Sequence, residues 1–214
     1  MTGLATVLNL LRRGSSSVDQ RAEGNKRGSL FVQKDMPDYT SLVKAGKVWN
    51  VGELTATAAV TGVPTTTAGL TLYNDEPEGS GKDYVMLAAF YTQVGNGAAL
   101  NSVHLMHLPS TIKPTTKPTA DIAAASIKNM KTPSGAYGGK AIVDLGATVA
   151  DDLWTPIGPF AGTTVVSLTG TSIFAWLYGL VIVEPGGQYS IESVASATGI
   201  TGRLGFIWAE DVDY

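Results

Sequence analysis

The chain has 214 residues, of which 44% are hydrophobic and only 15% charged, with no cysteine and a net charge of −3. Without cysteine the fold depends on neither disulfides nor thiolate metal ligands, and so small a net charge is no argument for a nucleic-acid or membrane partner. The longest apolar run, Ile173 to Val183, falls short of the roughly 18–20 residues that cross a bilayer. Since no positive segment precedes the apolar N-terminus, we expect a soluble and unprocessed protein.

The N-terminal region differs in composition from the rest. Residues 2–13 carry leucines at helical spacing and end in two arginines, which suit the C-terminal end of a helix: Leu4, Leu8, Leu11, Arg12 and Arg13. Residues 14–29 are polar and rich in glycine and serine, which predicts either a disordered tail or an arm that orders against a neighbouring subunit. Residues 1–34 hold six basic and two acidic residues, so they carry +4 and residues 35–214 carry −7. We expect an N-terminal helix and arm over 1–34 and a folded body over 35–214.

The arm ends in a short extended piece at Leu30, and the body opens with a turn and a helical turn. The first long strand is expected over residues 51–60. Its residues alternate, which places Glu53 on the side turned to solvent and Leu54 on the side turned to the core. Residues 68–73 form the next expected strand.

The middle of the chain combines a central strand with the one internal helix that we expect. Residues 83–94 are apolar on both faces, which is typical of a central strand covered on both sides. Gly95-Asn96-Gly97 predicts a tight hairpin that returns along residues 99–108. A proline-rich surface loop follows at 109–119, and the alanines of residues 120–130 favour a helix.

The last third of the chain predicts further strands. They lie at 141–149, 163–168, 173–183, 188–195 and 203–208, with an irregular loop at 150–162 and a Pro-Gly-Gly turn after Glu184. In the final strand Leu204, Phe206 and Trp208 share one face. About nine short strands in all predict an all-β fold: an antiparallel β-sandwich, most plausibly a jelly roll, with one short inserted helix and an extended N-terminal arm.

Several polar clusters contain residue types that could form metal or acid–base sites. His104 and His107 are three residues apart, so on a strand they face opposite sides and cannot share one metal ion. The acidic loop of Asp75, Glu76, Glu78 and Asp83 matches no calcium-loop spacing, which leaves open whether it holds a cation. Asp144, Asp151 and Asp152 include two adjacent carboxylates, for which a loop or capping role is favoured over acid–base catalysis.

Motifs of cofactor-binding and hydrolytic enzymes are missing from the sequence. Gly79-Ser80-Gly81-Lys82 lacks the first glycine and the final serine or threonine of a phosphate-binding loop. No third glycine follows Gly95-Asn96-Gly97, and no serine lies in a Gly-x-Ser-x-Gly elbow. The sequence therefore predicts no catalytic residue, no cofactor and no metal.

Three local segments resemble a known family. Residues 27–33, followed by 37–39 and Leu42, resemble the start of small structural proteins of tailed bacteriophages. Residues 179–189 and 205–208 resemble the last strands of trimeric jelly rolls in phage virions. The resemblance implies a capsid decoration (cement) protein or a head-to-tail structural protein that is present in several copies.

The first hypothesis is thus a non-enzymatic viral structural protein, a homotrimer in the virion that is made in the host cytoplasm. Its expected partners are other copies of itself and capsid or other virion proteins, with no membrane and no nucleic acid. The arm is expected to attach it to the shell through Leu4, Leu8, Leu11, Arg12, Arg13, Arg21, Arg27 and Phe31.

Two alternatives stay open. The protein could be a carbohydrate- or receptor-binding module, with aromatic stacking platforms supplied by Trp49, Tyr137, Trp154, Trp176 and Tyr178. It could also be a major shell subunit or a head-tail connector subunit, because its size and single expected domain suit either role.

Overall fold

The computed structural model describes residues 21–24, 30–33, 39–95, 102–133, 135–149, 153–162 and 171–210. The chain forms two compact units, Met1–Ala45 and Gly46–Tyr214. The expected strand at 163–168 and the expected helix at 2–13 lie outside the described residues.

The N-terminal unit contains a small hairpin and a short helix. Strand β1 (Arg21–Gly24) pairs antiparallel with β2 (Leu30–Gln33), and Gly24 lies opposite Leu30. The helix α2 (Thr40–Lys44) follows. The extended piece expected at Leu30 is confirmed, whereas β1 lies in the segment for which the composition predicted only a tail or an arm.

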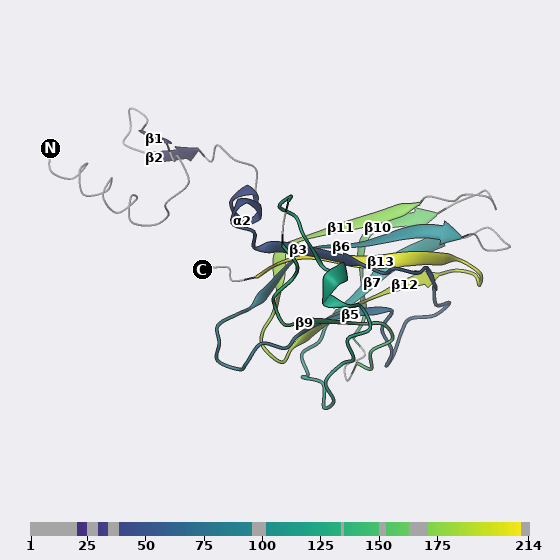
Figure 1. The fold of residues 1–214 in the computed structure, drawn as a ribbon. Helices are drawn as coiled ribbons and strands as arrows, with labels where there is room; N and C mark the ends of the chain where they lie inside the picture. The colour runs from purple at the N-terminus through teal and green to yellow at the C-terminus, as the bar shows by residue number, and fades with distance from the viewer. Residues whose placement is uncertain are drawn as a thin grey trace, which may run out of the picture. The chain divides into compact units, whose positions relative to one another are not determined.

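The second unit is a sandwich of two antiparallel sheets, seen as two layers of strands in Figure 1. One layer, the β6 sheet, consists of β11 (Ser172–Val183), β6 (Tyr84–Gly95), β13 (Thr201–Glu210), β3 (Val48–Gly52) and β8 (Lys128–Asn129), with β4 (Thr57–Ala58) beside β13. The other layer, the β12 sheet, consists of β10 (Thr155–Gly162), β7 (Ser102–Pro109), β12 (Gln188–Ala195), β5 (Leu70–Asn74) and β9 (Ala141–Asp144).

The strand order is that of a jelly roll. When β3, β5, β6, β7, β10, β11, β12 and β13 are counted from one to eight along the chain, the β6 sheet runs 6-3-8-1 and the β12 sheet runs 5-4-7-2. Successive strands alternate between the two sheets, except that the fourth and fifth, β7 and β10, are neighbours in the β12 sheet. This is the arrangement of two interlocked Greek keys. The predicted jelly-roll sandwich is confirmed.

Aromatic side chains from both sheets fill the space between the layers. Trp208, Phe206 and Leu204 of β13 are at most 1% exposed, which confirms that they share a core-facing side. Across the sandwich Tyr189 of β12 packs on Phe206 with 5.6 Å between ring centroids. Each such burial contributes about 1.5–3 kcal/mol to folding, so the central strands of the two sheets hold the layers together.

The hairpin predicted at Gly95-Asn96-Gly97 is wrong. Strand β6 pairs with β11 and β13, whereas β7 pairs with β10 and β12 in the opposite sheet. The chain therefore crosses from one layer to the other between Gly95 and Ser102. A turn sequence predicts that the chain reverses, but it does not predict which strand the next segment pairs with. Pairing depends on which apolar faces are buried against each other in the sandwich.

The strand expected over residues 51–60 is interrupted, and its sides are reversed around Glu53. Strand β3 ends at Gly52, after which the Glu53 side chain is 3% exposed and Leu54 is 65% exposed. The carboxylate of Glu53 accepts hydrogen bonds from the Leu204 backbone N–H at 2.6 Å and from the Thr57 hydroxyl at 3.1 Å. These hydrogen bonds offset the cost of burying the Glu53 carboxyl group. The hydropathy pattern alone predicts a glutamate to face solvent, so it gave the wrong side.

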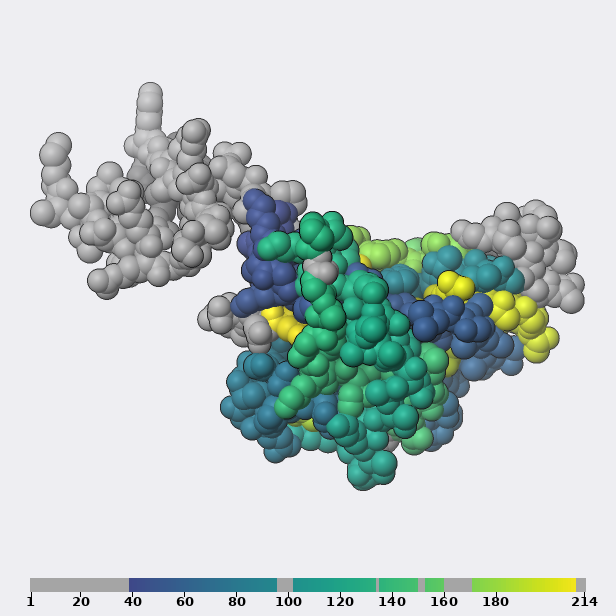
Figure 2. Space-filling view, viewed as in Figure 1, coloured from purple at the N-terminus to yellow at the C-terminus, as the bar shows by residue number. Residues whose placement is uncertain are grey.

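The expected helix over residues 120–130 is also wrong. The segment contains a single 3-10 turn, η1 (Ala124–Ser126), and the short strand β8, which pairs with β3. Ile122 and Ile127 are 2–3% exposed within the core cluster. Burial of both isoleucines outweighs the helix propensity of the alanines. The observed path brings both side chains to the core, whereas a helix would not place both of them on one buried face. Figure 2 shows the segment between β7 and β9, in teal and green, spread over the front of the molecule.

A strand takes the place of the irregular loop expected at 150–162. Strand β10 pairs with β7 at the edge of the β12 sheet, with a shift of register between Ile157 and Ala161. The strand contains Pro156 and Pro159. Proline is tolerated in an edge strand, because on the free side of that strand no backbone N–H is needed for pairing.

The two outer faces of the sandwich differ. On the β12 sheet, loop residues Ala68, Val149 and Trp154 form a second apolar cluster with strand residues Met106, Leu108 and Val194. Every residue of β12 is buried as a result, although its alternation would fit a half-exposed strand. The outer face of the β6 sheet carries no such cluster among the described residues.

Substitution of Gly205 by alanine should destabilise the sandwich by about 2 kcal/mol or more. A Cβ at this position would lie 2.2 Å from Phe90 Cζ and 2.6 Å from the backbone oxygen of Val51, so a strand would have to move. Urea unfolding of Gly205→Ala measures the loss. Gly62→Ala is the control, because no atom lies within 4 Å of its Cβ, and equal stability of the two variants would contradict the packing described.

Candidate interaction surface

Five exposed apolar side chains of the β6 sheet lie in one row on β11. We call this row the β11 strip: Phe174, Trp176, Tyr178, Leu180 and Ile182, which are 40%, 53%, 63%, 86% and 46% exposed. The intervening residues Ile173, Ala175 and Leu177 point into the core and are at most 6% exposed. Strand β11 is thus apolar on both sides, one facing the core and the other facing outward.

The position of β11 in the sheet explains why the strip is open. Among the described strands it is the edge strand of the β6 sheet and pairs only with β6, and Phe174 lies opposite Phe90. The register shifts between Trp176 and Val181, where Tyr178 and Gly179 adopt φ values of 51° and 79°. A left-handed tyrosine inside a strand is uncommon, and here it belongs to a bulge that directs the strip outward.

The aromatic rings of the strip touch one another in sequence. Phe90 and Phe174 are stacked with 6.1 Å between centroids, and Phe174 meets Trp176 edge to face at 4.8 Å. Trp176 and Tyr178 are stacked at 5.9 Å with 24° between ring planes. Because the rings support one another, the strip is a preformed platform rather than a set of independent side chains.

The middle of the strip has few charged neighbours, whereas Glu184 follows its end and Lys128 lies opposite Asn50 in the sheet. The cross-strand register places Phe90, Thr92, Arg203, Ile207 and Asn50 on the same outer face. Arg203 is the one charged residue among these five neighbours. A surface with these properties is typical of the central part of a protein–protein interface, where charged residues are depleted and aromatic residues enriched.

The two histidines do not form a shared site. Both lie on β7, where His104 is opposite Val194 and His107 is opposite Ile191, so they point to different faces as the spacing predicted. Nδ1 of His107 lies 3.1 Å from the Tyr189 hydroxyl, and burial lowers the pKa of this histidine. These contacts assign His107 to the core packing.

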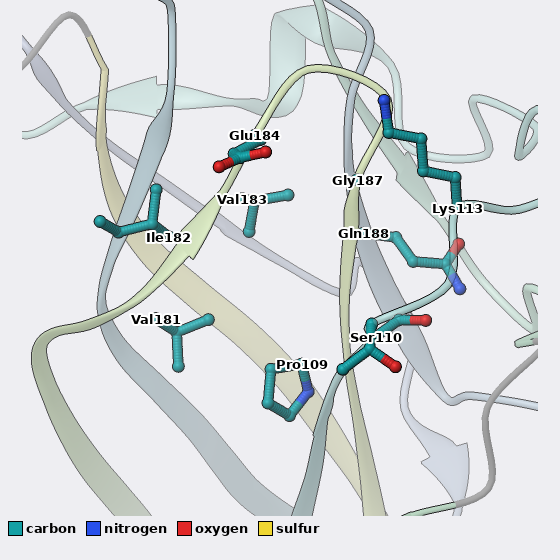
Figure 3. Close-up of a pocket in the computed structure, with 10 residues that line it drawn as sticks. Pro109, Ser110, Lys113, Val181, Ile182, Val183, Glu184, Gly187 and Gln188 are labelled. Carbon is teal, nitrogen blue, oxygen red and sulfur yellow. The ribbon is translucent and has the colours of Figure 1, made fainter.

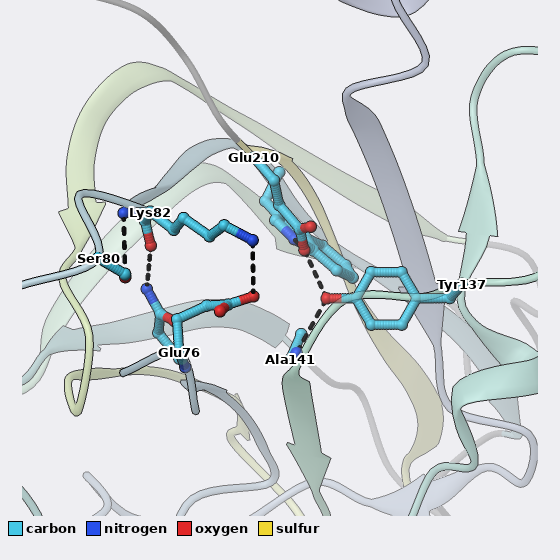
Figure 4. Close-up of polar contacts among 8 residues, drawn as sticks. Glu76, Ser80, Lys82, Tyr137, Ala141 and Glu210 are labelled. Carbon is cyan, nitrogen blue, oxygen red and sulfur yellow. Dashed lines mark hydrogen bonds and ion pairs between the residues drawn. The ribbon is translucent and has the colours of Figure 1, made fainter. Parts of the chain in front are cut away.

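Lysines face the carboxylates of the acidic loop. Lys117 Nζ lies 2.6 Å from Asp75, Lys113 Nζ 2.6 Å from Glu78 and Lys82 Nζ 3.7 Å from Glu76, the last pair being drawn in Figure 4. Exposed pairs of this kind contribute little to stability, but they offset the negative charge that a cation would need. Within the described residues no group of histidine, aspartate and glutamate has the arrangement of a metal site.

The buried carboxylic acids support the fold. Asp144 accepts a hydrogen bond from the Thr119 backbone N–H at 2.5 Å; burial raises its pKa, and Asp121 beside it raises it further. Asp151 and Asp152 lie outside the described residues. Burial also raises the pKa of Glu53, and that of Glu192 to about 7. Glu192 accepts a hydrogen bond from the Ser193 N–H at 2.8 Å, and the sequence pattern revealed neither glutamate as a buried acid.

Only two of the five predicted stacking aromatics are well exposed. Trp154 is 6% exposed and donates its indole N–H to the Thr65 oxygen at 3.3 Å. Tyr137 is 7% exposed; it donates to Glu210 at 2.5 Å (Figure 4), and Trp49, which is partly buried, packs on its ring edge to face at 4.8 Å. Prediction of Trp49, Tyr137 and Trp154 as platforms is therefore wrong, because each ring packs inside the body.

The sequence pattern predicted only two of the five residues of the strip. Trp176 and Tyr178 were considered as platforms, but Phe174, Leu180 and Ile182 were not. The available signal was that Ile173 to Val183 is apolar at every position, which a half-buried edge strand does not require. Of the predicted attachment residues, Arg21 lies on β1 and Phe31 on β2, and the others lie outside the described residues: Leu4, Leu8, Leu11, Arg12, Arg13 and Arg27.

Comparison with known proteins identifies no relative: no protein-family model, no curated protein and no solved structure matches the chain. In the part of the chain that the structure describes, no helix has the length and hydropathy needed to cross a membrane.

Replacement of Glu192 by glutamine should remove a large part of the pH dependence of stability. With a folded-state pKa of about 7 and an ordinary value of 4.5, the folded state binds the extra proton, so the unfolding free energy falls as pH rises from 4.5 to 7. The loss reaches about 3 kcal/mol above pH 7. Glu192→Gln should be more stable than the wild type at pH 8 and similar at pH 4.5.

Urea unfolding between pH 4.5 and 8 measures this difference. The exposed Glu184→Gln is the matched control and should follow the wild-type profile. Parallel profiles for Glu192→Gln and wild type would mean that Glu192 is ionised in the folded protein.

Proposed function

We propose that the protein is a non-enzymatic structural protein of a bacteriophage virion, of the capsid decoration (cement) type. In this proposal copies of the chain associate through their bodies, as a homotrimer, and the N-terminal arm attaches the assembly to the shell. The observation that carries the proposal is the open, nearly uncharged β11 strip on a jelly roll whose other outer face is covered by its own loops.

The size of the strip supports a role in association. A large side chain presents roughly 150–250 Å², so the exposed fractions of the five residues come to about 600 Å² of apolar surface. That is the upper end of what a monomeric protein leaves in one patch. Burial of such a patch against another protein surface is favourable by the same hydrophobic effect that holds the sandwich together.

The buried polar groups support a structural role as well. Asn74 donates hydrogen bonds to the backbone oxygens of Lys82 and Val183, at 2.9 and 2.8 Å, and so ties the acidic loop to the end of β11. The Glu210 carboxylate accepts from Tyr137 and from the Trp208 indole, at 2.5 and 2.8 Å. The bonds of Asn74 and the Tyr137–Glu210 bond join separate segments of the fold, which is consistent with a structural role.

Attachment through the arm rests on sequence and resemblance. The leucines and arginines of residues 2–13 suit a helix that docks with one apolar side. The charge of +4 on residues 1–34 is opposite to the −7 of the remaining chain, so the arm has a different electrostatic preference from the body. The phage-like segment at 27–33 lies in the same region.

Removal of the arm should separate attachment from oligomerisation. Light scattering after size-exclusion chromatography is expected to give three chains of 22.3 kDa for the full-length protein. A protein starting at Leu30 should keep the same subunit number and lose binding to purified phage particles. Monomers at every concentration in both proteins would contradict the association of the bodies, and particle binding without residues 1–29 would contradict the role of the arm.

Carbohydrate or receptor binding is the second candidate, favoured by the stacked and exposed pair Trp176–Tyr178. Aromatic faces of this kind also suit the apolar side of a sugar ring. On a glycan array the wild-type protein should bind no sugar if the strip serves protein association. Glycan binding that disappears in Trp176→Ala and persists in Trp49→Ala would replace the structural proposal with this one.

A further inference from the structure

A hollow of about 220 Å³ lies at the edge of the sandwich, between the end of β7 and the end of β11. Nearer the start of β11, β10 packs against it: a Cβ on Gly158 would lie 3.0 Å from the Cβ of Ala175. The pairing of β10 with β7 begins at Thr155, opposite His107, whereas β7 continues to Pro109. The hollow therefore opens where β7 extends beyond β10.

One side of the hollow is apolar and the rest is mainly polar. In Figure 3 the apolar side chains of Val181, Val183 and Pro109 lie at the left and below, while the polar residues lie above and at the right. Five lining residues have polar side chains: Ser110, Thr111, Lys113, Glu184 and Gln188. A lining of this kind suits a ligand that has both an apolar surface and several hydrogen-bonding groups.

Gln188 is the polar lining residue that most needs a partner. It is 2% exposed, and among the described residues neither its amide nitrogen nor its amide oxygen has a hydrogen-bond partner. A buried polar group left in this way is destabilising and calls for an explanation. Because no hydrogen bond holds the amide, it can turn about its side-chain bonds toward the hollow without breaking one.

The charges at the hollow disfavour a ligand with a single charge. Lys113 Nζ lies 2.6 Å from the Glu78 carboxylate, and Glu184 lines the same hollow. An anion beside Lys113 would also meet these carboxylates, and a cation beside Glu184 would meet the ammonium group. A purely apolar ligand would leave the Gln188 amide without a partner. The lining thus favours a neutral ligand with several donors and acceptors.

We propose that the hollow binds a single sugar ring through the carboxamide of Gln188. Two neighbouring hydroxyl groups match an amide, since one donates to its oxygen and the other accepts from its nitrogen. Further hydroxyls around the ring reach Lys113 and Glu184, because a hydroxyl both donates and accepts. The C–H face of the ring packs on the valines and the proline. A peptide group has only one donor and one acceptor, so it would satisfy the amide alone.

The size of the hollow agrees with one ring. A cavity of roughly 150 Å³ admits a benzene molecule, so about 220 Å³ accommodates a six-membered ring with its hydroxyl groups. The ring is either a free monosaccharide or the terminal residue of a glycan that continues into solvent. The inference goes beyond the proposed function and does not depend on it, because it involves neither the arm nor the association of the bodies.

Saturation-transfer NMR on the full-length protein tests the binding with glucose, galactose, mannose and N-acetylglucosamine. At least one of these sugars should bind with a dissociation constant on the order of 1 mM, since a single ring has few atoms to contribute. Affinity this weak does not survive the washing of a glycan array, so it is measured in solution. Equal binding of the methyl glycoside identifies a terminal residue as the ligand, and its loss identifies the free sugar. Absence of transfer to all four sugars would overturn the inference.

Replacement of Gln188 by leucine should weaken sugar binding by about 10-fold or more, since two hydrogen bonds are lost. The urea midpoint of Gln188→Leu should equal or exceed that of the wild type, because the removed amide had no partner in the fold. Gln93→Leu is the matched control. Gln93 is 6% exposed, but its amide donates to the Gly95 oxygen at 3.2 Å and lies away from the hollow, so this variant should lose stability and keep sugar binding.

Two matched lysines test the rim of the hollow. Lys113 and Lys117 each place Nζ 2.6 Å from a carboxylate, and their side chains are 55% and 53% exposed, but only Lys113 lines the hollow. Lys113→Ala should weaken sugar binding by about 3- to 10-fold, and Lys117→Ala should leave it unchanged.

The outcomes separate this site from the β11 strip, with which it shares only Ile182. Wild-type affinity in Gln188→Leu would overturn the inference. Sugar binding that is lost in Trp176→Ala and kept in Gln188→Leu would do the same and would place the sugar on the strip. The subunit number from light scattering is measured independently, so failure of the sugar site leaves the structural proposal standing.

Discussion

The packing of Phe206 on Tyr189, with 5.6 Å between ring centroids, joins the central strands of the two sheets. Strand β13 carries Phe206 between β6 and β3, and β12 carries Tyr189 between β7 and β5. Once these two strands face each other, their neighbours are held by backbone hydrogen bonds and complete the jelly-roll order. The outer strands, β11 among them, depend on this centre for their position and orientation.

A sandwich buries only the inner faces of its sheets, so apolar side chains on an outer face stay exposed unless loops or another protein cover them. On the β12 sheet the loops around Ala68 and Val149 provide a second apolar cluster. On the β6 sheet the β11 strip keeps aromatic and aliphatic side chains in contact with water. One outer face is therefore covered by the chain's own loops and the other exposes apolar side chains, and the proposed role in assembly rests on this difference.

The candidate surface was partly predictable from sequence. Trp176 and Tyr178 are conspicuous in the apolar run and are exposed. Trp49, Tyr137 and Trp154 are equally suitable by residue type, but they pack inside the body. Aromatic residues serve cores and interfaces equally well, so residue type alone does not separate the two. Glu53 is the converse case: an acid expected at the surface is buried because the Leu204 N–H and the Thr57 hydroxyl satisfy it.

The sequence by itself determined the class of fold, since alternating apolar residues and glycine or proline turns predict strands without reference to partners. It predicted the limits of β12 and the inward face of Leu204, Phe206 and Trp208. Only the tertiary structure decided that β6 and β7 lie in different sheets, that residues 120–130 are extended and that β11 is an edge. These features depend on contacts between residues far apart in the chain, which local periodicity does not encode.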